Sequence, residues 1–564
     1  MSAGQGAAGA ELTGGQVVVE GLRREGVKHV FCVPGESYLG ALDALYDARD
    51  IRLIVNRQEG GACYMAEGYA KATRSVGVCF VTRGPGATNA SIGIHCASQD
   101  STPLVLFVGQ VPRPNRGREA LQEVDYERFF GGMAKWVVEP QSAARLAEAV
   151  PRAFHVARSG RPGPVIVALP EDMLLERTDA RLRNPYPRSQ PHPDPAQIFE
   201  LARRIAAAEK PVLIVGSGVQ DTASRQALIR CAERHGLPVT TSFRRMDAFP
   251  NSHPNYAGNL ATGMTCGQDT VRGADLVVVI GDRLSEITTN DYRIPAPGQP
   301  LVHVDIEPEV IGQNFATELG IVSDAGLALA ALLEHAPETL GAGRAAWIKE
   351  RHARYLEFST PPDRPAARVS MDRVARDLSR LLPKDAILTV DAGNFSGWIH
   401  RFHRFDVEHS FLGPTVGSMG YGLPSAIGAK LAYPDRTVIA TCGDGGALMT
   451  MQELATAVQH DIPVIQLVFN NGSFGTIRMH QERQFPGRTV ATDLANPDFA
   501  ALGRAMGAAG YTVRTSDEFA PALQAALTGG KPAVLDVLTD LEQISVSATL
   551  AELRAGKGAS RRAK

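Results

Sequence analysis

The chain has 564 residues, about three to four times the length of a typical domain, so several packed domains are expected. Hydrophobic residues make up 44% and charged residues 21%, and these proportions exclude a disordered, collagen-like or coiled-coil chain. The 58 basic and 60 acidic residues give a formal net charge of -2, so the chain lacks the overall basic field with which many proteins bind nucleic acid.

The cysteines and the N-terminus indicate the cellular compartment. Seven cysteines are scattered without a CxxC pair, and several lie in apolar runs such as Val78-Cys79-Phe80, where a reduced thiol packs as a small hydrophobic group. The first ten residues lack the apolar core of a signal peptide, and no stretch approaches the roughly 18 consecutive apolar residues of a membrane span. We therefore expect a cytoplasmic protein with no membrane segment and no nucleic-acid partner.

Short β-branched runs end in glycine-rich turns and lead into helical periodicity along the whole chain. This pattern is typical of α/β domains with parallel sheets, and the runs fall into three clusters. The first and third clusters are candidates for two copies of one topology. In chain order the predicted strands are Val76 to Val81, Leu104 to Val108, Val165 to Leu169, Val212 to Val215, Leu276 to Ile280, Leu301 to Val304, Ile387 to Val390, Val438 to Thr441, Val464 to Phe469 and Ala533 to Leu538.

Proline-rich segments separate the clusters. The stretch from 185 to 195 contains five prolines and predicts a stiff, extended linker. The predicted domains therefore cover residues 11–180, 195–345 and 370–545. A basic tail follows at 546–564, which we expect to be solvated and frayed; its charged residues are Arg554, Lys557, Arg561, Arg562 and Lys564.

The most specific feature is the turn Thr441-Cys442-Gly443-Asp444-Gly445-Gly446, directly after a predicted strand. A helix follows, with apolar residues Leu448, Met451, Leu454 and Val458 every three or four positions. In an open α/β sheet, anionic ligands bind where strands end and helices begin. An acidic residue fits such a site if Mg²⁺ lies between the carboxylate and a phosphate.

The next predicted strand ends in Asn470-Asn471-Gly472-Ser473, which brings a second oxygen donor to the same sheet edge. Each turn alone is more often only a turn. Together, after consecutive strands, they indicate a site, and they resemble the thiamin diphosphate motif. This resemblance assigns the Mg²⁺ ligands to Asp444, the side chain of Asn471 and the main-chain carbonyl of Ser473. No GxxxxGK[ST] segment is present, so a P-loop is not supported.

A thiamin diphosphate enzyme needs a carboxylate at N1′ of the pyrimidine, where sharing a proton favours the imino form that activates C2. The segment from Asn56 to Ala70 resembles the family's R-x-E-x-x-A-x-x-M-A-E-G-Y-A motif, and the resemblance makes Glu59 the catalytic carboxylate. The alternative for a lone Glu59 is a charge that complements the helix dipole. Glu67, two turns later, is expected to brace the helix.

Other cofactor contacts follow from the same resemblance. In Thr415 to Pro424, Met419 is the apolar prop that folds the cofactor, and the Gly417 carbonyl receives its 4′-amino group. Met419 could otherwise be core filler. The diphosphate is expected to meet donors in the segment from Asp391 to Asn394 and in the Gly-Asp-Gly-Gly turn. These additional cofactor-binding residues are Gly393, Asn394, Gly443, Gly445 and Gly446.

The resemblance covers essentially the whole chain and is greatest to the acetolactate synthase large-subunit group. It implies three doubly wound domains in the order pyrimidine-binding, central and diphosphate-binding. It also implies decarboxylation of a pyruvate-like 2-oxo acid with carboligation to a second carbonyl. Because relatives pair the cofactor domains between subunits, a homodimer or homotetramer is implied, with active sites between subunits.

Several positions depart from the synthase pattern. His480 stands where synthases carry the tryptophan that favours 2-oxobutyrate as second substrate, and Phe395 stands where they carry a histidine. Of the flavin-contacting elements only Arg283 matches, so FAD is possible but not expected. Glu36 replaces a small residue in the loop that shapes the acetolactate pocket, and it would add charge near the reacting carbon. The substrate could therefore be a 2-oxo acid other than pyruvate.

Two further residues, Gln122 and His95, are candidates for the active site. Gln122, next to Glu123, matches a synthase glutamine that reaches the active site, and with Glu59 and His480 it completes the predicted catalytic set. A loop amide such as Gln122 is otherwise solvent-facing. His95 lies near the cofactor or is a core histidine with its hydrogen bonds satisfied.

Alternative functions within the family are a 2-oxo acid decarboxylase or aldehyde lyase and a flavin-dependent 2-oxo acid oxidase. The missing His-His pair of simple pyruvate decarboxylases favours carboligation. A non-catalytic paralogous subunit is the alternative outside enzymes, and the presence of Glu59 argues against it.

Overall fold

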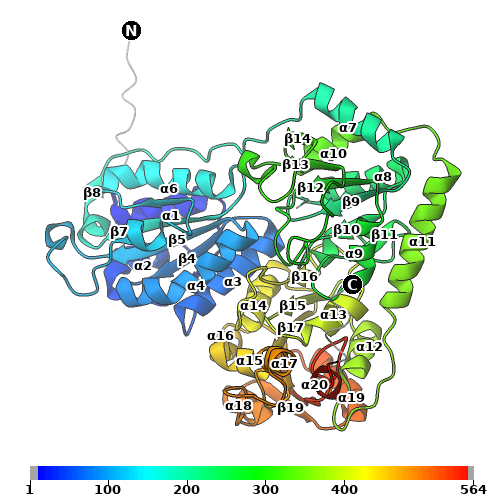
Figure 1. Cartoon of the computed structure of the whole chain (residues 1–564). Helices are drawn as coiled ribbons and strands as arrows, with labels where there is room; N and C mark the ends of the chain where they lie inside the picture. The colour runs from blue at the N-terminus through cyan, green and yellow to red at the C-terminus, as the bar shows by residue number, and fades with distance from the viewer. Residues whose placement is uncertain (1–10, 220, 557–564) are drawn as a thin grey trace. The chain divides into compact units, whose positions relative to one another are not determined.

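The computed structural model describes residues 11–219 and 221–556, and the chain divides into two compact units after Ser189. Figure 1 shows three parallel sheets flanked by helices, one in the first unit and two in the second. The α/β fold with three parallel-sheet domains is confirmed. Each predicted strand is present to within one or two residues, and the domain limits themselves stay a prediction.

The first unit is built on one six-stranded sheet in the order β3-β2-β4-β5-β7-β6, with all pairs parallel. Helices α1, α2 and α6 contribute to the hydrophobic core on one face, and α3 packs against α4. That packing is close because Gly93 faces Cys63, where an added Cβ would lie 2.2 Å from the Cys63 side chain. The elements are β1 (Leu12–Thr13), α1 (Gly14–Arg24), β2 (His29–Cys32), α2 (Leu39–Tyr46), β3 (Arg52–Val55), α3 (Glu59–Thr73), β4 (Gly77–Val81), α4 (Gly84–Asp100), β5 (Leu104–Gln110), α5 (Tyr126–Phe130), β6 (Trp136–Val138), α6 (Ala143–Arg158), β7 (Pro164–Pro170) and β8 (Arg177–Thr178).

The second unit opens with a sheet in the order β11-β10-β9-β12-β13-β14. Counted along the chain, its strands run 3-2-1-4-5-6, the arrangement of dinucleotide-binding domains. No helix or strand occupies 179–194, as expected for the proline-rich linker. The elements are α7 (Pro195–Ala207), β9 (Pro211–Val215), α8 (Thr222–His235), β10 (Val239–Thr241), β11 (Tyr256–Asn259), α9 (Thr265–Arg272), β12 (Leu276–Ile280), β13 (Leu301–Asp305), β14 (Leu319–Val322), α10 (Ala325–Leu333) and α11 (Ala342–Phe358).

The third sheet has the order β16-β15-β17-β18-β20-β19. Along the chain this is 2-1-3-4-6-5, the same as in the first unit, so the suspected repeat of one topology is confirmed. The elements are α12 (Met371–Leu381), β15 (Ile387–Val390), α13 (Ser396–Phe402), β16 (Phe411–Leu412), α14 (Gly422–Ala432), β17 (Val438–Gly443), α15 (Asp444–Thr450), α16 (Glu453–Gln459), β18 (Ile465–Asn470), α17 (Gly475–Gln484), α18 (Phe499–Ala505), β19 (Ala509–Val513), α19 (Ser516–Thr528), β20 (Ala533–Leu538) and α20 (Leu550–Arg554).

Two sequence-based expectations are wrong. The helix after the Gly-Asp-Gly turn is two short helices, α15 and α16, and Leu448 is exposed rather than facing the core. The described part of the C-terminal tail is not frayed, because Leu550 and Leu553 are buried and Arg554 pairs with Glu482 of α17 at 2.6 Å. Lys557, Arg561, Arg562 and Lys564 lie outside the described residues.

The cysteines behave as predicted for reduced thiols. All seven are free and buried, and burial raises the pKa of Cys32 and Cys231 to about 12. Among the described residues, no helix is both long and apolar enough to cross a bilayer.

Candidate functional site

The Gly-Asp-Gly turn joins β17 to α15, and Asp444 is the first residue of that helix. Its carboxylate collects hydrogen bonds from two loops. The Gly445 N–H donates to Oδ1 at 2.9 Å, and the Gly472 N–H donates to Oδ2 at 2.8 Å. Since β17 and β18 are adjacent parallel strands, the two turns meet at one sheet edge, as the sequence predicted.

The Asn-Asn-Gly turn after β18 is closed around the same carboxylate. The Ser473 N–H lies 3.3 Å from Asp444 Oδ2 and 3.0 Å from Asn471 Oδ1. Ser473 is buried, and its hydroxyl donates to the Thr492 carbonyl at 2.9 Å. The structure therefore brings Asp444, Asn471 and Ser473 together, with one carboxylate and one amide oxygen in a single small cluster.

Asn496 is a part of this cluster that the sequence analysis missed. Its Nδ2 donates to Asp444 Oδ2 at 2.8 Å and to Asn470 Oδ1 at 3.0 Å. Asn470 in turn donates to Asp536, a carboxylate on β20. Asn496 follows the Gly-Asp-Gly turn by 52 residues and lies in a loop before Pro497, so its only local signal is that of a turn.

The donor set fits a hard divalent cation. Asp444 is 3% exposed, and among the described residues of its unit it forms no ion pair. Burial raises its pKa above 3.8, although the hydrogen bonds from the surrounding N–H groups act in the opposite direction. Among the described residues, no group of three or more His, Cys, Asp or Glu side chains is arranged to hold a metal ion. Carboxylate, amide and carbonyl oxygens suit Mg²⁺.

Two glycines of the Gly-Asp-Gly-Gly turn are packed closely against neighbouring side chains. A Cβ on Gly445 would lie 2.5 Å from the Phe474 ring, and a Cβ on Gly446 would lie 2.2 Å from Asp391 Oδ2. Neither position has room for a larger residue. Gly443 caps the helix from the end of β17.

Asp391, at the end of β15, connects three of the predicted cofactor loops. Its Oδ1 accepts from the N–H of Ala392 at 3.0 Å and of Tyr421 at 3.2 Å, while Oδ2 lies against Gly446. Arg244 of the central sheet domain donates to the Asp391 carbonyl at 3.0 Å. Sequence analysis named the segment but not this carboxylate, since no local pattern shows that it is completely buried.

Burial raises the pKa of Asp391 from 3.8 to about 6, although backbone N–H groups and Arg244 act in the opposite direction. A folded-state pKa above the unfolded one means that folding stability falls as pH rises from about 4 to about 6. We expect the Asp391→Asn variant to lack this fall, because it has no proton to lose. Thermal melting of both proteins between pH 4 and pH 7 measures it, and parallel curves would contradict the assignment.

The segment that contains Met419 turns sharply at two glycines with positive φ, Gly417 at 69° and Gly420 at 81°. The Gly420 carbonyl accepts from the Thr450 hydroxyl at 2.7 Å, which ties this loop to the end of α15. Met419 itself is half-buried, so it is not core filler. The loop is therefore fixed to the same turn that contains Asp444.

In the loop after β15, two residues predicted to bind the cofactor already make contacts within the protein. Gly393 has φ 148° and lies under the Phe395 ring. The Asn394 side chain donates to the Ile544 carbonyl at 3.0 Å, and its main-chain N–H donates to Thr476 Oγ1 at 3.1 Å. Asn394 therefore connects the loop to α17 and to the segment before α20.

In the first unit, Glu59 is the first residue of α3, directly after the turn that follows β3. Gln58 caps this helix by accepting from the Gly61 N–H at 2.9 Å. Asn89 of α4 donates to Glu59 Oε2 at 2.9 Å. Glu67, as expected, braces the helix: it is buried and binds Lys71 at 2.8 Å and the Thr102 hydroxyl at 2.7 Å.

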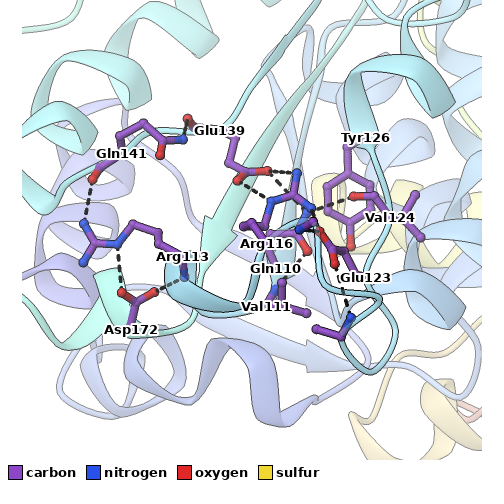
Figure 2. Close-up of polar contacts among 12 residues, drawn as sticks. Gln110, Val111, Arg113, Arg116, Glu123, Val124, Tyr126, Glu139, Gln141 and Asp172 are labelled. Atoms are coloured by element: carbon purple, nitrogen blue, oxygen red, sulfur yellow. Dashed lines mark hydrogen bonds and ion pairs between the residues drawn. The ribbon is translucent and has the colours of Figure 1, made fainter.

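Gln122 lies on a loop that the structure holds from two sides. Gln122 is exposed, has φ 64°, and accepts from the Gly84 N–H of α4 at 3.0 Å through its carbonyl. On the other side, Glu123 binds Arg116 at 2.6 Å, and Arg116 also binds Glu139 at 3.0 Å. Figure 2 shows this network together with Gln110, which donates to the Val124 carbonyl.

Both candidate histidines, His95 and His480, lie at the surface. His95 is exposed, so its alternative as a core histidine is wrong. His480 is exposed on α17, next to the buried Met479. The catalytic assignment of His480 stays a prediction.

Comparison with known proteins gives matches in all three sheet domains. The chain matches the N-terminal thiamine pyrophosphate (thiamin diphosphate) binding domain of thiamine pyrophosphate enzymes over 12–129, the central domain over 198–332 and the C-terminal binding domain over 391–537. The chain belongs to the thiamine pyrophosphate enzyme family.

Proteins that are similar over almost the full length of this chain show to which group within the family it belongs. The chain is 34% identical over 552 residues to the probable acetolactate synthase large subunit of Methanocaldococcus jannaschii, covering 94% of this chain and 92% of the relative. It is 34% identical to the acetolactate synthase large subunit of Haemophilus influenzae and 34% identical to the isozyme 3 large subunit of Escherichia coli, each with 92% of both chains covered. The protein is thus a thiamin diphosphate-dependent enzyme of the acetolactate synthase-like group.

Proposed function

We propose that this enzyme uses thiamin diphosphate and Mg²⁺ to decarboxylate a pyruvate-like 2-oxo acid and to join the remaining carbon unit to a second carbonyl. The observation that carries the proposal is the buried Asp444 carboxylate, which has no ionic partner among the described residues of its unit and is surrounded by the two turns of the family motif. The full-length similarity to acetolactate synthase large subunits supports carboligation.

The cofactor, when bound, supplies the electron sink for decarboxylation. We propose that Asp444, Asn471 and the Ser473 carbonyl hold Mg²⁺. Gly443, Gly445, Gly446, Gly393 and Asn394 line the diphosphate-binding site. The rest of the set lies in other segments: Glu59 holds the proton at N1′, the Gly417 carbonyl receives the amino group, Met419 props the cofactor, and Gln122 and His480 face the substrate.

The assembly is proposed to be a homodimer or homotetramer in which Glu59 of one copy and Asp444 of another serve one cofactor. Exposed apolar side chains on the helices of the candidate site support this, because such side chains are typical of an interface core. They are Ile92 of α4, Leu448 and Met449 of α15, and Ile477 of α17. We place the protein in the cytoplasm because its thiols are free.

The cofactor set is proposed without flavin, because the central domain carries Gly258-Asn259-Leu260 and Leu284-Ser285-Glu286 in place of the synthase flavin elements. A flavin absorption spectrum in the purified protein would contradict this part of the proposal, and turnover that reduces this flavin would favour the oxidase instead. Decarboxylase or lyase activity would give an aldehyde rather than a carboligation product.

The test uses purified protein with thiamin diphosphate, Mg²⁺ and pyruvate. We expect release of CO₂ and formation of a 2-hydroxy-2-methyl-3-oxo acid, detected as acetoin after acid treatment. CO₂ with aldehyde alone would identify the decarboxylase. Absence of turnover with pyruvate and with a panel of branched, aromatic and hydroxylated 2-oxo acids would contradict the proposal.

A further inference from the structure

Glu36 lies at the carboxyl end of β2, on a single 3-10 turn, Glu36–Tyr38, that is fixed firmly in the first unit. The Ser37 hydroxyl lies 2.9 Å from Thr82 Oγ1, and a Cβ on Gly109 would lie 1.9 Å from Ser37 Oγ. The buried Tyr38 hydroxyl donates to the Val33 carbonyl at 2.5 Å. The backbone of Glu36 is therefore held in place while its side chain remains 65% exposed.

The buried guanidinium of Arg83 forms an ion pair with the Glu36 side chain. The guanidinium is 9% exposed, and its NH2 group lies 2.9 Å from Glu36 Oε1 and 3.4 Å from Glu171 Oε2. The other oxygen of Glu36, Oε2, accepts no hydrogen bond from any described residue of this unit. Two carboxylates around one guanidinium also leave one negative charge uncompensated. Glu36 thus presents an oriented, charged hydrogen-bond acceptor at the sheet edge.

This acceptor is close to the predicted catalytic residues in the fold. β2 lies between β3, which leads to Glu59, and β4, which leads to Arg83. Arg83 is the N-cap of α4, and the first turns of α4 contact two predicted catalytic residues, Glu59 and Gln122. Asn89 donates to Glu59, and a Cβ on Gly86 would lie 3.5 Å from Glu59 Oε1. The Gly84 N–H donates to the carbonyl of Gln122.

We propose that Glu36 is a specificity-determining residue that selects a 2-oxo acid with a hydroxyl group on its side chain, and that Arg83 is the positioning residue that orients it. This inference rests on the proposed function and names its substrate class. A hydroxyl can donate to Glu36 Oε2, and an unsubstituted alkyl chain cannot. A second carboxylate on the substrate is repelled by the uncompensated negative charge. Arg83 partly neutralises the charge of Glu36, and the nearness of this charge to the reacting carbon stays part of the proposal.

The test compares matched substrates in the full enzyme loaded with thiamin diphosphate and Mg²⁺. The pairs are pyruvate with 3-hydroxypyruvate and 2-oxobutyrate with 4-hydroxy-2-oxobutyrate, and 2-oxoglutarate is the dicarboxylic probe. We expect the wild type to favour the hydroxylated member of at least one pair by about tenfold or more in kcat/KM, the size of a hydrogen bond to a charged group. In Glu36→Ala this ratio should fall about tenfold, and 2-oxoglutarate should become a better substrate.

Two further variants separate specificity from folding. Glu36→Gln keeps the side-chain volume and should lower the ratio in the same direction. Arg83→Lys keeps the charge but loses the planar guanidinium, and we expect a raised KM for the hydroxylated substrate with a smaller change in kcat. A purely structural role would change both members of a pair equally. The control is Glu148→Gln, an exposed carboxylate paired with Arg145 at 3.0 Å on α6, which should leave the ratio unchanged.

The outcomes distinguish this inference from the proposed function. Turnover of 2-oxo acids with no hydroxyl preference, or a preference that persists in Glu36→Ala, would overturn the role of Glu36 and leave the proposed function standing. Absence of turnover with every substrate would overturn both.

Discussion

The Glu59→Gln variant is expected to turn over 2-oxo acids about 10²–10⁴-fold more slowly than the wild type, the usual range for loss of a general acid–base group. Glutamine has the same shape, and its amide oxygen can still accept from Asn89, the contact that the structure gives Glu59 Oε2. What it cannot do is exchange a proton with the pyrimidine of the cofactor. The loss should therefore appear in kcat, measured as CO₂ release at saturating cofactor and substrate.

The control for this variant is Glu20→Gln, an exposed carboxylate on α1 paired with Arg24 at 3.1 Å. It should keep wild-type turnover, since exposed ion pairs of this kind contribute little to stability. Glu59→Gln should keep the wild-type melting temperature to within a few degrees. Wild-type kcat in Glu59→Gln would show that another group activates the cofactor.

The Asp444→Asn variant is expected to lose Mg²⁺-dependent binding of thiamin diphosphate, with an apparent affinity about 100-fold weaker or more. The carboxylate charge is what attracts the cation, and an amide oxygen binds a hard cation less strongly. Asparagine also places an NH₂ group among donors, because both oxygens of Asp444 accept hydrogen bonds from N–H groups. Isothermal titration with thiamin diphosphate, with and without Mg²⁺, measures the loss.

The pH dependence of that affinity gives a second readout. Because burial raises the pKa of Asp444, protons compete with Mg²⁺ at higher pH than for an exposed aspartate, and wild-type affinity should weaken as pH is lowered. The matched control is Asp498→Asn, a helix cap that accepts from the Ala501 N–H at 2.8 Å, since asparagine caps a helix equally well. If Asp444→Asn bound Mg²⁺ and cofactor like the control, this carboxylate would not be the metal ligand.

The sequence predicted much of the fold because parallel strands are short apolar runs that end in glycine-rich turns. The turns at Asp444 and Asn471 could be joined because they follow consecutive strands, and adjacent parallel strands end at one edge. Glu59 was predicted from the motif around it, and its catalytic role stays a prediction. In each case the information lies within a few residues of the site.

What the sequence did not reveal depends on contacts between distant segments. Asn496 reaches Asp444 from a loop 52 residues away, and Asp391 is recognised only when its complete burial is known. The pairing of Glu36 with Arg83 joins turns after two strands. The described part of the tail was predicted as frayed because its charge was visible, whereas the buried carboxylate of Glu482 that pairs with Arg554 was not.

The most direct test of the central claim is hydrogen–deuterium exchange at C2 of thiamin diphosphate bound with Mg²⁺, followed by quenched-flow mixing and proton NMR without substrate. The claim is that the metal held at Asp444 anchors this cofactor and that Glu59 activates it. We expect rapid exchange in the wild type and exchange at least about 100-fold slower in Glu59→Gln with the cofactor still bound. Equal exchange rates in the two proteins would contradict the account.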